Sequence, residues 1–204
     1  MNNLAGVTAL KNTYFVARHG KSLANEQEII LSDPAHGTTD FGLTEEGKEQ
    51  ARLSAEAAKK QGVLDSSALI ISSDFTRARE TAEIIAGILG VSEVALSPKL
   101  RERYFGNWER THNSNYQKVW DKDQHDSSHT EESVESVDDV LGRTTELILE
   151  IEQKYQGKNI VLVSHGDALQ ILQTAFEGAH PSQHRSLTHL NTAEIRKLQY
   201  VAGA

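Results

Sequence analysis

Two short stretches of the chain contain residues that could do chemistry, Arg18-His19-Gly20 and Ser164-His165-Gly166. Each directly follows an apolar run, 13–17 in the first case and 159–163 in the second, so each histidine is predicted where a buried strand opens into a loop or helix. Open parallel sheets place their active sites at such strand ends. An imidazole there can act as a nucleophile or a base, and an arginine beside it can hold an anionic group.

A third apolar run, 68–71, leads into the segment 72–82, which contains Arg77. A single histidine beside an arginine is more often a structural residue than a catalytic one, but two such strand ends in one chain make coincidence a weaker explanation. Three strand ends are therefore expected to bring together the side chains of Arg18, His19, Arg77 and His165.

Six motifs follow one another along most of the chain. They read ARHGKSLAN (17–25), GLTEEGKEQA (42–51), SSDFTRARETA (72–82), LRERYFGNWE (100–109), ESVDDVLGR (135–143) and VSHGDAL (163–169). In type and order they resemble the histidine phosphatase superfamily, the group that includes cofactor-dependent phosphoglycerate mutase. This resemblance implies a phosphoglycerate mutase-like fold and an enzyme of phosphoryl transfer.

The resemblance further implies that His19 is the nucleophile and becomes a phosphohistidine, while Arg18, Arg77 and His165 surround the transferring group. This chemistry is physically reasonable, because a neutral imidazole can attack phosphorus in line while donors already in place hold the charge on the equatorial oxygens. A guanidinium grips two phosphate oxygens at once and keeps its charge near neutral pH, which suits both arginine positions.

The leaving alkoxide needs a proton, and the resemblance implies Glu102 as its donor. A dianionic phosphate nearby raises the pKa of a carboxyl group, which favours the protonated form that can donate. Arg101 and Arg103 would oppose that effect if they faced Glu102, so we expect them to point away from it or toward the substrate. Without the resemblance, Glu102 is better interpreted as a surface carboxylate in a charged loop.

Ser22 and Asn25 lie three and six residues beyond His19, at the predicted start of a helix. They can face an anion there, or they can cap the helix, since both residue types are preferred caps. Both interpretations can hold together. By resemblance Ser22, Asn25 and Gly166 belong with Arg18, Arg77 and His165 to the residues that bind substrate.

Strands and helices are predicted to alternate, which is typical of a three-layer α/β sandwich with a mainly parallel central sheet flanked by helices. The segment 33–37 is rich in turn residues and is expected to be a loop. We expect a single domain over residues 1–204, with a polar insertion at about 103–134. Helices are expected at about 44–61, 74–90, 136–155 and 167–176, and strands at about 13–17, 68–71, 159–163 and 192–198.

The polar stretch 111–135 contains three histidines, His112, His125 and His129. His125 and His129 are four residues apart, a spacing that on a helix could ligate a metal. A solvated insertion near the pocket mouth is the preferred interpretation, because residues 126–128 are poor helix formers and no third ligand is evident. No metal and no cofactor are expected, since arginines and histidines supply the positive charge.

Composition and charge argue against several classes of protein. A net charge of −8 disfavours nucleic-acid binding through a general basic surface, and the absence of cysteine excludes disulfides and thiolate catalysis. No signal peptide and no run of about 18 apolar residues is evident, so the expected location is cytoplasmic, without a membrane partner. A small phosphorylated substrate is the expected partner, and the sequence leaves the oligomeric state open.

These observations favour a metal-independent phosphatase that hydrolyses small phosphomonoesters, such as a sugar phosphate, through a phosphohistidine on His19. One alternative is a cofactor-dependent phosphoglycerate-type mutase. In those mutases the region corresponding to 103–134 is longer and carries a Trp-Arg-Arg segment, whereas this chain has no Arg-Arg pair there, which favours hydrolysis. The other alternative is a non-catalytic module that binds phosphorylated ligands.

Arg110 is a local departure from the family pattern, which often has glycine at this position after Trp108-Glu109. A second departure is Val134, where glycine usually precedes Glu135-Ser136. Neither position belongs to the predicted catalytic set, so the departures bear on the backbone shape at the rim of the pocket.

Overall fold

A five-stranded sheet forms the centre of the computed structural model, which describes residues 2–202. The strand order is β3-β2-β4-β1-β5, with β1 to β4 mutually parallel and β5 antiparallel to β1. The strands are β1 (Thr13–Arg18), β2 (Leu69–Ser72), β3 (Val94–Leu96), β4 (Asn159–Ser164) and β5 (Ile195–Lys197). The predicted α/β fold with a mainly parallel sheet is therefore confirmed.

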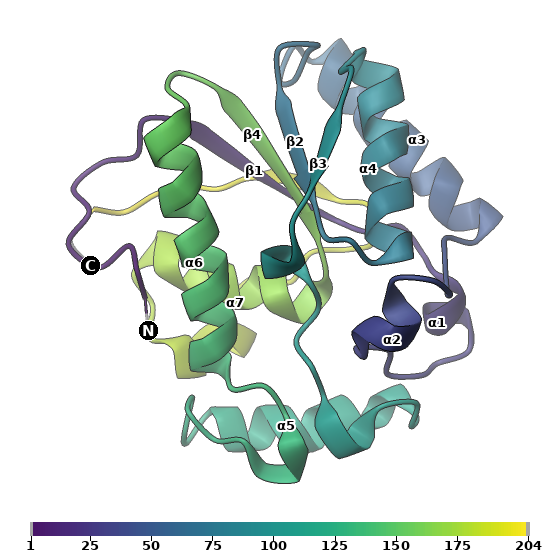
Figure 1. Cartoon of the computed structure of the whole chain (residues 1–204), viewed down its shortest axis with the longest axis vertical. Helices are drawn as coiled ribbons and strands as arrows, with labels where there is room; N and C mark the ends of the chain where they lie inside the picture. The colour runs from purple at the N-terminus through teal and green to yellow at the C-terminus, as the bar shows by residue number, and fades with distance from the viewer. Residues whose placement is uncertain (1, 203–204) are drawn as a thin grey trace.

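Helices cover both faces of this sheet, α3 and α4 on one side and α6 and α7 on the other (Figure 1). The α-helices are α1 (Leu23–Glu26), α2 (Pro34–Gly37), α3 (Glu45–Lys60), α4 (Thr76–Leu89), α5 (Tyr116–Asp123), α6 (Val137–Lys154) and α7 (Gly166–Glu177). Short 3-10 helices are η1 (Pro98–Leu100), η2 (Gly106–Trp108), η3 (Asn113–Asn115), η4 (Glu131–Ser133) and η5 (Pro181–Ser186).

Alternation along the strands explains the two-sided core. In β1, Tyr14 and Val16 pack in the apolar cluster that includes α6 and α7, whereas Phe15 and Ala17 pack in the cluster with α3 and α4. Successive side chains of a strand point to opposite faces, so a strand buried on both faces must be apolar throughout. The uninterrupted apolar run of β1 follows from this position inside the sheet.

Capping residues fix the long helices close to their predicted bounds. The Thr44 side chain accepts a hydrogen bond from Gly47 N at 3.0 Å and starts α3, and Ser136 accepts from Asp139 N at 3.0 Å and starts α6. Helix α4 ends at Gly90, whose φ of 84° is the left-handed conformation that glycine adopts at little cost.

Three details of the predicted elements are wrong. The turn-rich segment 33–37 contains the one-turn helix α2, because Asp33 accepts a hydrogen bond from Ala35 N at 2.8 Å and Pro34 occupies the first helical position. Strand β3 was not predicted, since its three residues are too few to show a periodicity. The last strand covers only Ile195–Lys197 of the predicted 192–198.

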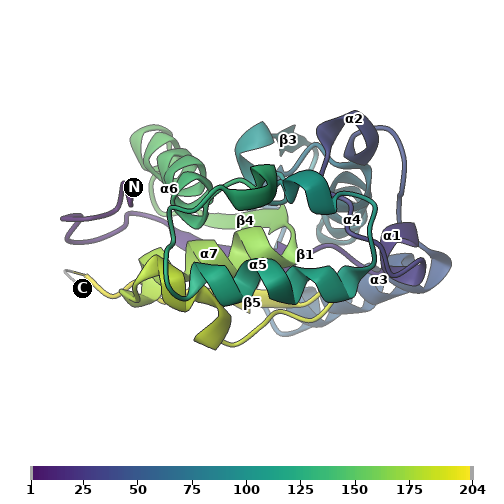
Figure 2. The same ribbon diagram turned by 90° about the horizontal axis from the view of Figure 1, so that it is seen from below.

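The insertion lies across the carboxyl ends of the strands, with α5 at the end of the molecule opposite the tops of α3 and α6 (Figures 1 and 2). Its residues Phe105, Val119 and Val134 pack with Ile30, from outside the insertion, in a small apolar cluster. The expectation of a solvated insertion is wrong for its inner side, because Val119, Asp123 and His129 are buried there. No helix within residues 2–202 is long and apolar enough to cross a membrane.

Candidate active site

The topology brings the predicted site residues together. Strands β2, β4 and β1 are neighbours and run parallel, so their carboxyl ends meet at one edge of the sheet. His19 follows β1 directly, His165 follows β4, and Arg77 lies in the first turn of α4 after β2. Gly20 is required beside His19, because a Cβ there would lie 2.3 Å from the carbonyl oxygen of Gly47 in α3.

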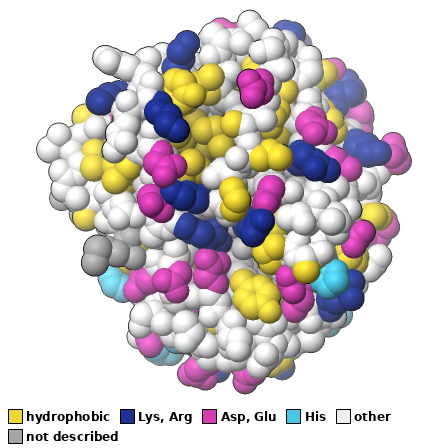
Figure 3. Space-filling model, viewed as in Figure 1, with side chains coloured by type: hydrophobic (Ala, Val, Ile, Leu, Met, Phe, Trp, Pro, Cys, Tyr) yellow, Lys and Arg dark blue, Asp and Glu magenta, His cyan; other side chains and the backbone are white. Residues whose placement is uncertain are grey.

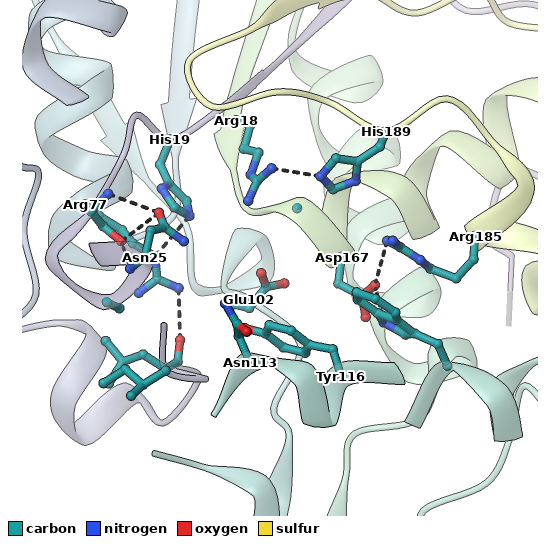
Figure 4. Close-up of a pocket in the computed structure, with 16 residues that line it drawn as sticks. Arg18, His19, Asn25, Arg77, Glu102, Asn113, Tyr116, Asp167, Arg185 and His189 are labelled. Carbon is teal, nitrogen blue, oxygen red and sulfur yellow. Dashed lines mark hydrogen bonds and ion pairs between the residues drawn. The ribbon is translucent and has the colours of Figure 1, made fainter. Parts of the chain in front are cut away.

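A cavity of about 330 Å³ opens at this edge (Figure 4). Seven of the eight predicted site residues line it, namely Arg18, His19, Ser22, Asn25, Arg77, Glu102 and Gly166. His165 is fully buried and does not line the cavity; its ring packs against that of His19 with 5.1 Å between the ring centroids. The site predicted from the sequence is therefore assembled around His19.

Hydrogen bonds fix the state of the His19 ring. Its Nδ1 lies 2.7 Å from the carbonyl oxygen of Gly20, which can only accept, so Nδ1 carries the proton. Its Nε2 accepts from Arg77 Nε at 3.1 Å and therefore holds a lone pair. Burial, together with the positive charges of Arg77 and Arg18, holds the pKa of His19 well below its usual value. The ring is thus a neutral imidazole near neutral pH.

The two arginines are anchored through part of their donors only. Arg18 Nη1 donates to Leu190 O at 2.9 Å and contacts His189 Nε2 at 2.8 Å, while Arg77 Nη2 donates to Leu31 O at 3.0 Å. Within the described residues, Arg18 Nε and Arg77 Nη1 are buried with no hydrogen-bond partner. A buried donor without a partner costs about 1–3 kcal/mol, a penalty that an anionic ligand would relieve.

His165 has an unpartnered nitrogen as well. Its Nε2 lies 2.9 Å from Ser73 Oγ, and this hydroxyl accepts a hydrogen bond from Phe75 N, so its proton is available to Nε2. In that arrangement Nδ1 carries the ring proton, and Nδ1 is buried without a partner in the described part of the chain. Burial and the nearby Arg77 lower the pKa of His165 well below its usual value.

Glu102 is buried at 9% exposure, with Oε1 accepting from Arg103 N at 2.9 Å and from Ala168 N at 3.1 Å. Burial and the negative charge of Asp167 raise the pKa of Glu102, while Arg77 and the two backbone donors act in the opposite direction. A raised pKa favours the protonated carboxyl that an acid catalyst needs. Arg101 and Arg103 do not line the cavity; they bind Asp74 and Asp123 instead.

Ser22 and Asn25 form the start of α1. Ser22 Oγ accepts from Asn25 N at 3.3 Å, and Asn25 Oδ1 accepts from Ser22 N at 3.0 Å, a reciprocal capping box. The capping interpretation is confirmed. Both side chains also line the cavity. The cap occupies the amide oxygen of Asn25, so Nδ2 of Asn25 is the donor that an anion could use.

Comparison with known proteins identifies the family. The sequence model of the histidine phosphatase superfamily (branch 1) matches residues 14–204. The chain belongs to this superfamily. Among curated relatives it is 32% identical over 191 residues to a probable phosphoglycerate mutase GpmB of Photorhabdus laumondii, covering 91% of this chain and 84% of the relative. It is 31% identical to phosphoglycerate mutase-like protein 4 of Arabidopsis thaliana, covering 87% of this chain and 75% of the relative.

Solved structures include phosphatases with the same fold. A phosphoserine phosphatase variant from Entamoeba histolytica, in complex with phosphoserine, superposes with a TM-score of 0.75 at 26% identity, covering 94% of this chain and 92% of the other. A mycobacterial glucosyl-3-phosphoglycerate phosphatase superposes with a TM-score of 0.75 at 23% identity, covering 95% and 100% of the two chains. The latter likeness establishes the fold of the chain.

Sequence reasoning missed several residues that line the cavity. Six of them are polar or aromatic: Asn113, Tyr116, Trp120, Asp167, Arg185 and His189. Asp167 follows Gly166 inside the VSHGDAL motif, so its position offered a signal. The other five lie in irregular or short elements, where no periodicity or spacing distinguished them from surface residues.

The histidines of the insertion do not form a metal site. His129 Nε2 lies 2.7 Å from Asp123 Oδ1, whereas His125 is exposed. Within residues 2–202, no group of three or more His, Cys, Asp or Glu side chains is arranged to hold a metal ion. The positive charge beside Asp123 comes from Arg103, at 2.6 Å.

Proposed function

We propose that this protein hydrolyses small phosphomonoesters through a phosphohistidine on His19, without a metal ion. The observation that carries the proposal is the neutral His19 ring, whose Nε2 lone pair faces the Arg77 guanidinium inside the cavity. The buried unpartnered donors of Arg18, Arg77 and His165 support it, because a transferring phosphoryl group needs preorganised donors around its equatorial oxygens.

In the first step, Nε2 of His19 gives up its hydrogen bond from Arg77 Nε and attacks phosphorus, while the bond from phosphorus to the leaving oxygen breaks. The leaving alkoxide takes the proton of Glu102, so alcohol departs and the ring is phosphorylated. In the second step water attacks phosphorus, the bond from phosphorus to Nε2 breaks, and the Glu102 carboxylate takes the proton of the water. Inorganic phosphate leaves, and both His19 and Glu102 return to their starting states.

Phosphoglycerate mutase activity is the second candidate function, since curated relatives more than 30% identical to this chain are named as phosphoglycerate mutases or as mutase-like. A mutase must retain the substrate's second anionic group while the phosphoryl group is exchanged. The insertion contributes only uncharged side chains to the cavity wall, Asn113, Tyr116 and Trp120. The remaining cation of the wall, Arg185, lies 3.7 Å from the Asp167 carboxylate, which offsets its charge. This balance favours hydrolysis.

The experiment that tests the proposal is phosphate release from p-nitrophenyl phosphate and a panel of small phosphomonoesters, in EDTA, by the wild type and by His19→Ala. Release by the wild type that disappears in the variant supports a metal-independent histidine phosphatase. Interconversion of phosphoglycerates with little release, in a coupled assay, would favour the mutase. Tight binding of phosphate esters with neither activity would instead indicate a non-catalytic binding module.

A further inference from the structure

A group of charged and titratable residues is buried beside the cavity. None of them takes part in a step of the proposed reaction; Asp167 acts on the reaction only through its charge, which raises the pKa of Glu102. We call the group the inner ionic cluster; it consists of Arg103, Asp123, His129, Asp167 and His184. Their exposed fractions are 0%, 0%, 8%, 5% and 0% in that order. Burying charged groups costs several kcal/mol per ion unless they are paired in good geometry, so the cluster calls for a physical explanation.

Arg103 is the centre of the inner ionic cluster. Its Nη1 and Nη2 bind the two carboxylate oxygens of Asp123 at 2.6 and 2.8 Å, a bidentate pair, and Nη1 also lies 3.4 Å from Asp167. His129 Nε2 contacts the same Asp123 carboxylate at 2.7 Å. His184 Nε2 lies 3.7 Å from Asp123 and 3.6 Å from Asp167. One guanidinium therefore joins the last residue of α5 to the first turn of α7.

The cluster reaches the cavity from two directions. The backbone N of Arg103 donates to Oε1 of Glu102 at 2.9 Å, which ties the guanidinium to the proposed acid. On the other side, Asp167 Oδ1 accepts from Trp120 Nε1 at 3.0 Å, and Trp120 stacks on Tyr116 with 5.3 Å between ring centroids. Trp120 and Tyr116 both line the cavity. The position of this wall therefore depends on the cluster.

Apolar packing anchors mainly the first half of α5. Val119 is its one buried apolar residue, in a cluster of four that is separate from the two main cores, and Tyr116 packs against the same cluster with its ring centroid 4.7 Å from that of Phe105. The outer positions Gln117, Lys118 and Asp121 are exposed, and acidic side chains recur over the lower end of the molecule where α5 lies (Figure 3). One buried aliphatic side chain contributes about 1.5–3 kcal/mol and the ring pair about 0.5–1.5 kcal/mol, both from the first half of α5, so the polar contacts of Asp123 are needed to position its carboxyl end.

We propose that Arg103 and Asp123 are positioning residues whose bidentate pair holds α5 over the cavity, so that Tyr116 and Trp120 form the wall against the body of the substrate. The inference rests on the proposed function, because the wall is taken to contact the alcohol group that is esterified to phosphate in the substrate. The phosphate group itself is bound by Arg18 and Arg77, which lie outside the cluster. Loss of the pair therefore weakens recognition of the ester body and leaves binding of inorganic phosphate intact.

Asp123→Asn tests this proposal, because it keeps the side-chain shape and removes the charge that Arg103 binds. We expect kcat/KM for p-nitrophenyl phosphate to fall on the order of ten- to a hundredfold, the scale of a small misplacement of substrate-positioning groups. Competitive inhibition by inorganic phosphate should change less than about twofold. Glu131→Gln is the matched control, since it removes a carboxylate from the exposed Lys122–Glu131 pair of the same insertion.

Fluorescence gives a readout that does not require turnover. In a Trp108→Phe background, Trp120 is the one remaining tryptophan. Asp123→Asn should shift its emission to longer wavelength and increase quenching by acrylamide, while Glu131→Gln leaves both unchanged. If Asp123→Asn fails to fold, Arg103→Lys replaces it, because lysine keeps the charge but loses the bidentate fork; the same shift is expected.

Two results would overturn the proposal. One is a kcat/KM and a Trp120 emission in the folded variant equal to those of the wild type. The other is a loss of phosphate inhibition as large as the loss of kcat/KM, which would indicate a general weakening of the fold. If the wild type hydrolyses no ester, the proposed function fails, but Trp120 emission and phosphate binding still decide whether the pair positions α5.

Discussion

Nδ1 of His19 lies 2.7 Å from the carbonyl oxygen of Gly20, and this contact determines which nitrogen of the ring can attack phosphorus. Because the carbonyl only accepts, the ring proton stays on Nδ1, and the Nε2 lone pair faces the Arg77 guanidinium at 3.1 Å. The nucleophile is thus prepared by a backbone group next to it in sequence. No carboxylate partner is needed to select the tautomer.

Burial of two neutral histidines makes the stability of the fold depend on pH. The pKa values of His19 and His165 are lowered by burial and by Arg77, whereas in the unfolded chain both are about 6.5. Below about pH 6.5 the unfolded chain therefore binds more protons, so the free energy of unfolding decreases as the pH falls. Each histidine contributes a slope of up to about 1.4 kcal/mol per pH unit.

Urea unfolding between pH 5 and pH 8 measures this slope. His19→Asn removes one of the two groups, so the slope below about pH 6 should decrease by up to about 1.4 kcal/mol per pH unit relative to the wild type. Equal slopes in the two proteins would mean that His19 is not held neutral in the folded state.

Glu102→Gln tests the proposed proton donor through the leaving group. An alkyl phosphate needs a proton on its departing alkoxide, so its kcat/KM should fall by about 10²–10⁴-fold. p-Nitrophenolate is a stable anion and departs without a proton, so kcat/KM for its ester should fall much less. The second step, in which Glu102 takes a proton from water, follows departure of the leaving group and does not enter kcat/KM. The ratio of the two losses is the measured quantity. A similar loss for both substrates would exclude Glu102 as the acid and leave it a structural role.

His189 is expected to hold Arg18 in place. Arg18 always donates, so its 2.8 Å contact makes His189 Nε2 an acceptor, with the ring proton on Nδ1, 3.2 Å from Gln170 Oε1. Burial and Arg18 lower the pKa of His189 to about 4. His189→Ala should weaken inhibition by inorganic phosphate about two- to tenfold, the equivalent of one hydrogen bond.

His189→Gln restores an acceptor and should recover part of the phosphate binding. His125→Ala is the control, because His125 is exposed. In the wild type, phosphate binding should weaken below about pH 4, where His189 gains a second proton and repels Arg18. Phosphate inhibition identical in His189→Ala and the wild type would show that Leu190 O alone orients the guanidinium.

Arg110 carries backbone strain that glycine would remove. Its φ of 60° is in the left-handed region, its side chain is exposed, and its N donates to Ile30 O at 2.9 Å. This conformation costs a non-glycine residue about 1–2 kcal/mol, partly offset by the greater entropy of glycine in the unfolded chain. Arg110→Gly should therefore raise the free energy of unfolding by about 0.5–1 kcal/mol in urea titrations. A decrease would show that the side chain stabilises this turn.

Periodicity and motif order predicted most of the fold and of the site. Uninterrupted apolar runs predicted β1 and β4, and the helix starts predicted at about 44 and 136 coincide with the caps Thr44 and Ser136, because these signals arise from local backbone and burial requirements. His19 and His165 were found for the same reason, since each directly follows a predicted strand. The family often has glycine at position 110, which is consistent with the left-handed backbone conformation of Arg110, because glycine adopts that conformation at little cost.

The far wall of the cavity could not be predicted in this way. Arg185 lies in η5 and His189 in the irregular segment after it, and only the tertiary fold returns them to the cavity. Burial of Asp123 and His129 was missed because charged residues in a polar stretch ordinarily indicate solvent, and pairing with Arg103 reverses that preference. Such pairing depends on contacts between residues far apart in the chain.

The most direct measurement is to trap the phosphorylated enzyme. The protein is mixed briefly with a phosphomonoester in EDTA, quenched in alkali, digested and examined by mass spectrometry and phosphorus NMR. We expect one acid-labile, alkali-stable phosphoryl group on the peptide that contains His19, bonded to Nε2, and none in His19→Ala. Phosphate release by an enzyme that never carries this group, or a phosphoryl group on any other residue, would contradict the proposed mechanism.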